Sequence, residues 1–191
     1  VEIIRHWGYP VEELEVHTRD GYILSMYRIP RGRHEEASSC GQRPAILFVH
    51  GLTADSAEFV LNPPETSPTM ILADAGFDVF LLNHRGSTHS RKHVRLSPQD
   101  EEFWQFTLDE YANYDATAAV DKVLEVTGAT SLFWIGHSQG TTVGFMMLAD
   151  KPQYNQKVRA LFQIAPAGTA HYTRGSIRVF KLLYNLIKRV V

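Results

Sequence analysis

The sequence predicts an α/β fold in which helices flank a mostly parallel sheet. Short, continuously apolar runs alternate with longer stretches of helical periodicity, and such runs are typical of strands buried on both faces. Strand, helix and strand in repetition predict a doubly wound arrangement. The expected strands are Ala45 to Val49, Phe77 to Leu82, Ser131 to Ile135 and Val158 to Ala165, and the expected helices are Thr69 to Ala75, Leu108 to Val126 and Gln139 to Ala149.

The part of the chain before this alternation predicts a β-hairpin. Apolar and polar residues alternate in Glu13 to Thr18 and again in Tyr22 to Ile29, and the turn-forming pair Asp20-Gly21 separates the two runs. A polar stretch, Arg31 to Arg43, shows no periodicity and is expected to be an exposed connection.

Composition excludes several classes of protein. With 191 residues and 44% hydrophobic composition, the chain can bury one sizeable core. A net charge of -2 gives no general reason to expect nucleic acid as a partner. Cys40 is the only cysteine, so a disulfide within the chain is excluded. No phosphate loop or dinucleotide fingerprint is present, and we expect no cofactor.

Histidines do not form a convincing metal motif. His89 and His93 stand four residues apart, but they lack the adjacent glutamate of a zinc protease and an evident third ligand. We therefore expect no metal site.

The pentapeptide Gly136-His137-Ser138-Gln139-Gly140 carries the clearest chemical signal. It fits the G-x-S-x-G nucleophile elbow, in which a serine occupies a sharp turn between a strand and a helix. An expected strand precedes it and an expected helix follows it, as the elbow requires. The motif predicts the α/β-hydrolase fold with Ser138 as an acyl-accepting nucleophile. Glycine is expected at positions 136 and 140, because side chains there would collide with the neighbouring backbone.

An acyl-transfer site also needs hydrogen-bond donors for the oxyanion of its tetrahedral intermediate. The residue after the nucleophile, Gln139, is expected to supply one backbone N–H. The second is expected from Leu52, in the His50-Gly51-Leu52 segment that follows the first parallel strand. His137 is expected to be a structural or pocket-wall residue, because the turn directs it away from the serine hydroxyl.

Several segments stand in the order seen in one family: Ile4 to Pro10, Asp20 to Leu24, His50 to Leu52, Ala73 to Val79, Asn83 to Gly86, Glu102 to Trp104 and Gly136 to Thr142. Over almost its whole length the chain resembles the acid lipases, which are the gastric and lysosomal lipases and their relatives. The resemblance implies hydrolysis of triacylglycerol or cholesteryl esters in a lysosomal or secreted setting. Three positions depart from the family pattern: Phe59 replaces a common Trp, His84 a small residue and Ser87 a frequent Asn.

The expected base and acid of a catalytic triad are missing. In this fold the order along the chain is Ser, then Asp or Glu, then His. After Ser138 the chain offers only Asp150 and His171, and neither stands where the motif order places a triad member. The resemblance places the real acid and base beyond Val191, so we expect an amino-terminal portion of a longer enzyme, incomplete at its C-terminus and inactive alone.

The domain expectation follows from this. Residues 1–170 are expected to form the hydrolase core, and residues 171–191 to begin a truncated cap or lid. Apolar residues recur at helical spacing in Ser176 to Val191, while eight Lys or Arg and no Asp or Glu lie between residues 151 and 191. This segment predicts a basic amphipathic helix that contacts lipid or, equally, packs on the core.

Three functions remain open on sequence alone. The first is a serine-dependent ester hydrolase of neutral lipids. The second is a non-catalytic truncated lipase-like protein that binds lipid or membrane. The third is an esterase for small soluble esters on the same fold, since fold does not fix function.

Overall fold

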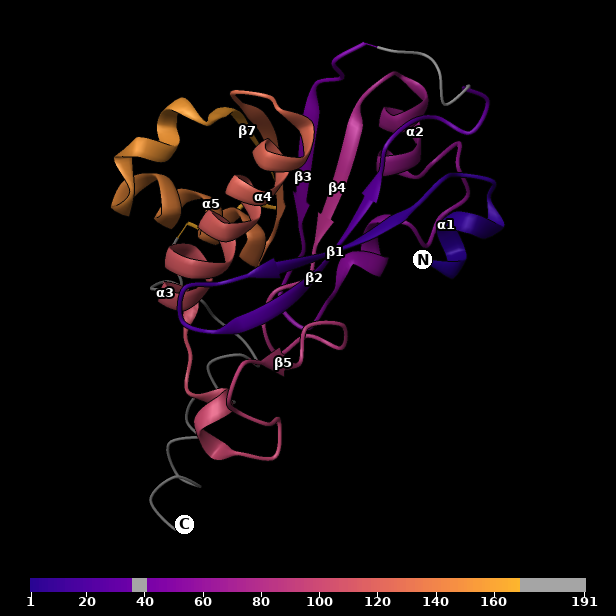
Figure 1. Cartoon of the computed structure of the whole chain (residues 1–191). Helices are drawn as coiled ribbons and strands as arrows, with labels where there is room; N and C mark the ends of the chain where they lie inside the picture. Colours follow the sequence, from indigo (N-terminus) through magenta and orange to yellow (C-terminus); the bar gives the residue numbers. More distant parts are fainter. Residues whose placement is uncertain (36–40, 169–191) are drawn as a thin grey trace.

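A computed structural model describes residues 1–35 and 41–168 and contains one mixed sheet (Figure 1). The strands run in the order β1-β2-β4-β3-β6-β7, and β5 pairs with β2. Their bounds are β1 Glu12–His17, β2 Tyr22–Ile29, β3 Ala45–Val49, β4 Asp78–Leu82, β5 Lys92–His93, β6 Leu132–His137 and β7 Val158–Ile164.

Strand pairing confirms the predicted sheet. β3 is parallel to both β4 and β6, and β6 is parallel to β7. The predicted hairpin, β1 with β2, joins this parallel part through an antiparallel pairing of β2 with β4. β5 was not predicted, because a two-residue strand has no periodicity to detect.

Short helical segments surround the strands. The α-helices are α1 Glu2–His6, α2 Pro68–Asp74, α3 Leu108–Glu110, α4 Thr117–Thr127 and α5 Gln139–Asp150, the 3-10 helices are η1 Ser56–Phe59, η2 Glu101–Trp104 and η4 Pro152–Gln156, and η3 Tyr111–Ala116 is a π-helix. Helices α2 and α5 agree with the prediction to within one residue. Helical residues run without a break from Leu108 to Thr127, which confirms the predicted helix from Leu108 to Val126. Its middle part is a π-helix, which was not predicted and which changes the hydrogen-bond spacing.

The sheet separates two hydrophobic cores. On β3, Leu47 belongs to the core beneath α4 and α5, whereas its neighbours Ile46 and Phe48 belong to the core on the side of α1 and α2. Figure 1 shows these two groups of helices on opposite sides of the sheet. All five β3 residues are buried, which explains why this strand reads as a continuous apolar run.

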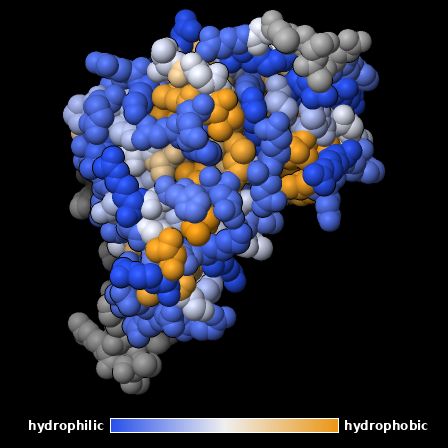
Figure 2. All heavy atoms as spheres, in the orientation of Figure 1, coloured by the Kyte–Doolittle hydropathy of each residue, from blue (hydrophilic) through white to orange (hydrophobic). Residues whose placement is uncertain are grey.

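The surface and the range of the described residues bear on the remaining sequence predictions. Figure 2 shows apolar residues on the viewed face as small groups separated by polar ones. None of the described helices has the length and apolar character needed to cross a membrane. Cys40, the predicted cap segment 171–191 and its amphipathic helix 176–191 lie outside the described residues.

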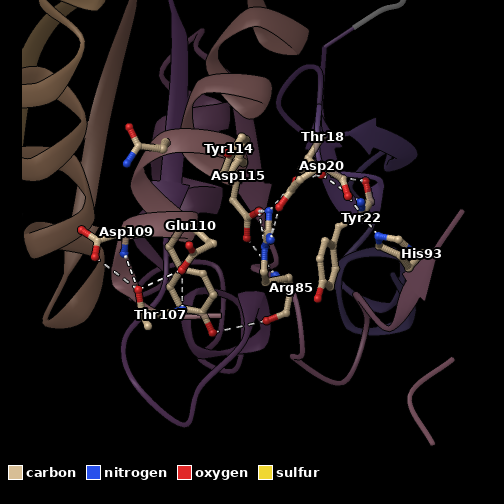
Figure 3. Close-up of polar contacts among 12 residues, drawn as sticks. Thr18, Asp20, Tyr22, Arg85, His93, Thr107, Asp109, Glu110, Tyr114 and Asp115 are labelled. Atoms are coloured by element: carbon tan, nitrogen blue, oxygen red, sulfur yellow. Dashed lines mark hydrogen bonds and ion pairs between the residues drawn. The ribbon is translucent and has the colours of Figure 1, made fainter. Parts of the chain in front are cut away.

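Arg85, in the loop after β4, is the largest buried cation and lies between two carboxylates (Figure 3). Its Nε donates to Asp115 Oδ1 at 2.8 Å, and its backbone N–H donates to Asp115 Oδ2 at 3.0 Å. Its Nη2 donates to Asp20 Oδ1 at 3.0 Å, and the guanidinium lies 4.0 Å from the centre of the Tyr22 ring. The network joins the hairpin turn, the loop after β4 and the π-helix.

We expect Asp115→Ala to lower the free energy of unfolding by about 3–5 kcal/mol, because it leaves Arg85 buried with one fewer counter-charge. Urea denaturation followed by circular dichroism measures this. Glu125→Ala is the matched control, since it removes an exposed pair with Lys122 and should cost less than about 1 kcal/mol. Equal losses in the two variants would contradict a structural role for the network.

Candidate active site

Ser138 lies at the junction of β6 and α5 in a strained backbone conformation. Its φ is 47° and its ψ is -111°, a region that residues with side chains rarely occupy. Such strain costs on the order of 1–3 kcal/mol and persists only where the surrounding structure enforces it. The side chain is half-buried, and among the described residues its hydroxyl makes no hydrogen bond. The predicted strand, turn and helix are therefore all present.

Close backbone contacts explain the two elbow glycines. A Cβ added at Gly140 would lie 2.2 Å from the carbonyl oxygen of Val49, at the end of β3. A Cβ added at Gly136 would lie 2.7 Å from the backbone of Gly140. Neither distance leaves room for a side chain, so the geometry requires glycine at both positions.

The loop after β3 brings the second predicted donor beside the elbow. A Cβ added at Gly51 would lie 3.3 Å from Ser138 Cβ, which puts this loop in contact with the nucleophile. Within the described residues neither the Leu52 nor the Gln139 N–H donates a hydrogen bond. The following residue, Thr53, has a φ of 60°, which is strained for a β-branched side chain. The structure thus brings the predicted donors and nucleophile together.

A pocket of about 230 Å³ adjoins the two predicted donors. Both Leu52 and Gln139 line it, and the rest of the wall includes the loop after β4 and aromatic residues, namely His84, Arg85, Ser87, Trp104, Phe106 and Tyr111. The wall is mainly apolar. Two of the positions that depart from the family pattern, His84 and Ser87, therefore lie in the wall of this pocket.

His50 is a neutral structural histidine. Burial, and to a lesser extent the neighbouring His84, lowers its pKa to about 4. Its Nδ1 lies 2.9 Å from the Gly51 carbonyl oxygen, and its Nε2 lies 3.2 Å from the His84 backbone nitrogen. Since that backbone N–H can only donate, Nε2 accepts and Nδ1 carries the proton. Both nitrogens are occupied, so His50 is not available as a base.

His137 contacts a carboxylate that sequence reasoning missed. Its Nδ1 lies 3.2 Å from both Glu58 carboxylate oxygens. The structural or pocket-wall role predicted for His137 stays a prediction. Glu58 carried no signal in the sequence, because η1 is a single short turn without periodicity. The same applies to Asp115, which lies in the unpredicted π-helix.

No triad is assembled within the described residues. Asp150 is exposed and ends the 12-residue helix α5, about 18 Å along the helix axis from Ser138. It is therefore too distant to orient a histidine at the nucleophile. His171 lies outside the described residues. In the described part of the chain, no three His, Cys, Asp or Glu residues gather as metal ligands.

Comparison with protein families identifies the family to which this fold belongs. A model described as "alpha/beta hydrolase fold" matches residues 44–179, and one described as "partial alpha/beta-hydrolase lipase region" matches residues 1–63. The first match covers more than half of the chain. The chain belongs to the α/β-hydrolase family.

Curated relatives of this α/β-hydrolase are lipases. It is 44% identical to human lipase member K over 190 residues, 42% identical to mouse gastric triacylglycerol lipase and 45% identical to mouse lipase member M. Each alignment covers 100% of the chain but only 45–48% of the relative. The chain therefore spans about half the length of these proteins, and the resemblance to the acid lipase group is confirmed.

Solved structures support the fold. An esterase from Pyrococcus furiosus matches with a TM-score of 0.58 at 17% identity, covering 83% of this chain and 52% of that one. A predicted hydrolase from Thermoplasma acidophilum matches with a TM-score of 0.55 at 18% identity, covering 84% and 65%. At such identities the likeness shows the α/β-hydrolase fold alone.

We expect Gly140→Ala to destabilise this α/β-hydrolase by about 3 kcal/mol or more, because the added methyl group collides with the backbone of β3. Urea denaturation measures the loss. Gly41→Ala is the control, since an added Cβ there meets no described atom within 4 Å. If both variants unfold at the same urea concentration, the close approach of α5 to β3 is wrong.

The depressed pKa of His50 predicts a loss of stability in acid. As the pH falls below about 6.5, His50 becomes protonated in the unfolded state, whereas in the folded state it stays neutral until about pH 4. Stability is therefore fully present above pH 6.5 and decreases toward pH 4, by up to about 3 kcal/mol. Denaturation at pH 7 and pH 4.5, compared with His50→Asn, isolates this contribution. A His50 ring that titrates near pH 6.5 in folded protein, measured by NMR, would refute it.

Proposed function

We propose that this protein is a carboxylic ester hydrolase of neutral lipids, triacylglycerol or cholesteryl esters, with Ser138 as its nucleophile. The observation that carries the proposal is the strained elbow at the β6-to-α5 junction, where the Ser138 hydroxyl and two nearby N–H groups make no hydrogen bond to any described residue. Lipase and triacylglycerol lipase relatives supply the substrate class.

In the proposed reaction, Ser138 Oγ attacks the carbonyl carbon of an acyl ester. The carbonyl oxygen gains negative charge, which the N–H groups of Leu52 and Gln139 stabilise. Collapse of the tetrahedral intermediate expels the alcohol and leaves an acyl-serine, which water then hydrolyses to release the fatty acid. Because Gln139 begins α5, the helix dipole adds favourable charge at the same point.

The proton of Ser138 must pass to a general base. Two described histidines near the elbow do not suit this role: both ring nitrogens of His50 are occupied, and His137 is paired with Glu58. His84 in the pocket wall is buried against Asp115 at 3.4 Å, and among the described residues no hydrogen bond joins it to Ser138. We therefore place the base and its carboxylate in residues other than those described, as expected for an amino-terminal portion of a lipase. On this proposal the 191-residue chain has little activity alone, since losing triad members costs on the order of 10⁴-fold or more.

The pocket beside the two donors suits an acyl chain. Its wall is mainly apolar and includes Trp104, Phe106 and Tyr111. Burial of methylene groups against such a wall contributes about 0.8 kcal/mol each. We further propose a secreted or lysosomal location, for which the gastric relatives are the support.

A second candidate function is non-catalytic lipid or membrane binding by a truncated lipase-like protein. Its support is the absence of a triad partner for Ser138 among the described residues, with Asp150 at the opposite end of α5. The proposed contact surface, the basic helix 176–191, lies outside those residues.

We expect a fluorophosphonate probe to label the protein extended by its natural downstream sequence, and Ser138→Ala to abolish this labelling and triacylglycerol hydrolysis together. Ser131→Ala is the matched control, because Ser131 precedes the opposite end of the same strand, β6. In-gel fluorescence and fatty-acid release measure the two effects. Absence of labelling in a folded, extended protein would reject the hydrolase and favour lipid binding.

A further inference from the structure

The Glu58 carboxylate joins two segments of the site that are far apart in sequence. Its Oε1 accepts a hydrogen bond from the Gly51 N–H at 3.2 Å. Both carboxylate oxygens also lie 3.2 Å from His137 Nδ1. Glu58 comes from η1, which is separate from both the loop after β3 and the elbow.

Each partner of Glu58 directly precedes a group with a proposed role. Gly51 precedes Leu52, whose N–H is the proposed donor, and His137 precedes Ser138. A planar peptide leaves only two soft dihedral angles per residue, so fixing Gly51 and His137 restricts where Leu52 and Ser138 can lie. One carboxylate therefore restrains the spacing between the nucleophile and residues 50–53 after β3, which we call the donor loop.

The loop needs such a restraint. Leu52 is 65% exposed, and Thr53 holds a strained φ of 60°, so apolar packing contributes little to the position of this turn. His50 holds the Gly51 carbonyl oxygen, and Glu58 holds the Gly51 N–H. Since the Gly51 N–H is already bonded to Glu58, it is not available to an oxyanion, and the next N–H along this loop is that of Leu52.

An ordinary ion pair would not produce this arrangement. Glu58 and His137 side chains are 22% and 38% exposed, so their mutual attraction is screened by water and contributes little stability. The additional bond to Gly51 makes the carboxylate a bridge with three contacts. Its effect is then on geometry more than on the free energy of unfolding.

We propose that Glu58 is a positioning residue that links the donor loop to the nucleophile elbow through Gly51 and His137. The inference rests on the proposed function. Misplacing a donor by about 1 Å costs up to roughly 100-fold in rate, so Glu58→Ala should lower kcat by about 10- to 100-fold with KM nearly unchanged. Glu58→Gln keeps a neutral acceptor for Gly51 and should fall between wild type and Glu58→Ala.

A matched variant separates geometry from stability. Glu65 is an exposed carboxylate outside η1 that lies 3.7 Å from Arg33, and among the described residues no hydrogen bond or ion pair joins it to Gly51 or His137. Glu65→Ala should therefore remove a carboxylate without changing kcat. Unchanged kcat in folded Glu58→Ala, measured on the extended protein with a soluble ester, would overturn the positioning role.

Amide hydrogen exchange tests the link without any activity. Glu58→Ala should speed exchange of the Gly51 amide, and His137→Asn should shift this rate as well, because both act on one carboxylate. If His137→Asn leaves Gly51 exchange unchanged, the link is wrong even in an active enzyme. If wild type hydrolyses no ester but the exchange pattern holds, the proposed function fails and the link stands.

Discussion

Burial of the Arg85 guanidinium imposes the main electrostatic constraint on this fold. Removing a cation from water costs several kcal/mol unless well-placed carboxylates compensate. The fold must therefore bring both Asp20 and Asp115 within hydrogen-bond distance of Arg85. These residues come from the hairpin turn and the π-helix, and Arg85 comes from the loop after β4. Tyr111, which donates to the Arg85 carbonyl oxygen at 3.3 Å, also lines the candidate pocket. The shape of the pocket wall therefore depends on this charge cluster, and Arg85 itself lines the pocket.

The candidate site is held by two different physical means. Steric contact fixes the elbow, since Gly140 lies against the backbone of β3 without space for a methyl group. Hydrogen bonds from polar side chains fix the donor loop, through His50 and Glu58. Steric contact is insensitive to pH, whereas bonds to ionisable side chains depend on protonation. Acid therefore acts on the donor loop through His50, whose pKa burial lowers to about 4, and not on the steric contact at the elbow.

Strong local patterns made much of the fold and part of the site predictable. Residues 45–49 are buried on both faces and form a continuous apolar run, and Ser138 stands in a motif whose glycines are required by sterics. Glu58, Arg85 and Asp115 could not be predicted in their roles, because each acts through a partner distant in sequence. The π-helix was missed for a related reason: its apolar pattern is helical, and the deviation arises where Asp115 meets Arg85.

The contact between Gly140 and Val49 also has an evolutionary consequence. A junction without spare volume tolerates almost no substitution, so the relative positions of β3 and α5 are expected to be inherited nearly unchanged. In the pocket wall, His84 is restricted as well, because its buried ring stacks on Tyr111 with ring centres 4.6 Å apart. Ser87, a small and half-buried residue of the same loop, is the wall position more open to change. Homologous sequences are then expected to differ at position 87 more often than at positions 84 and 140.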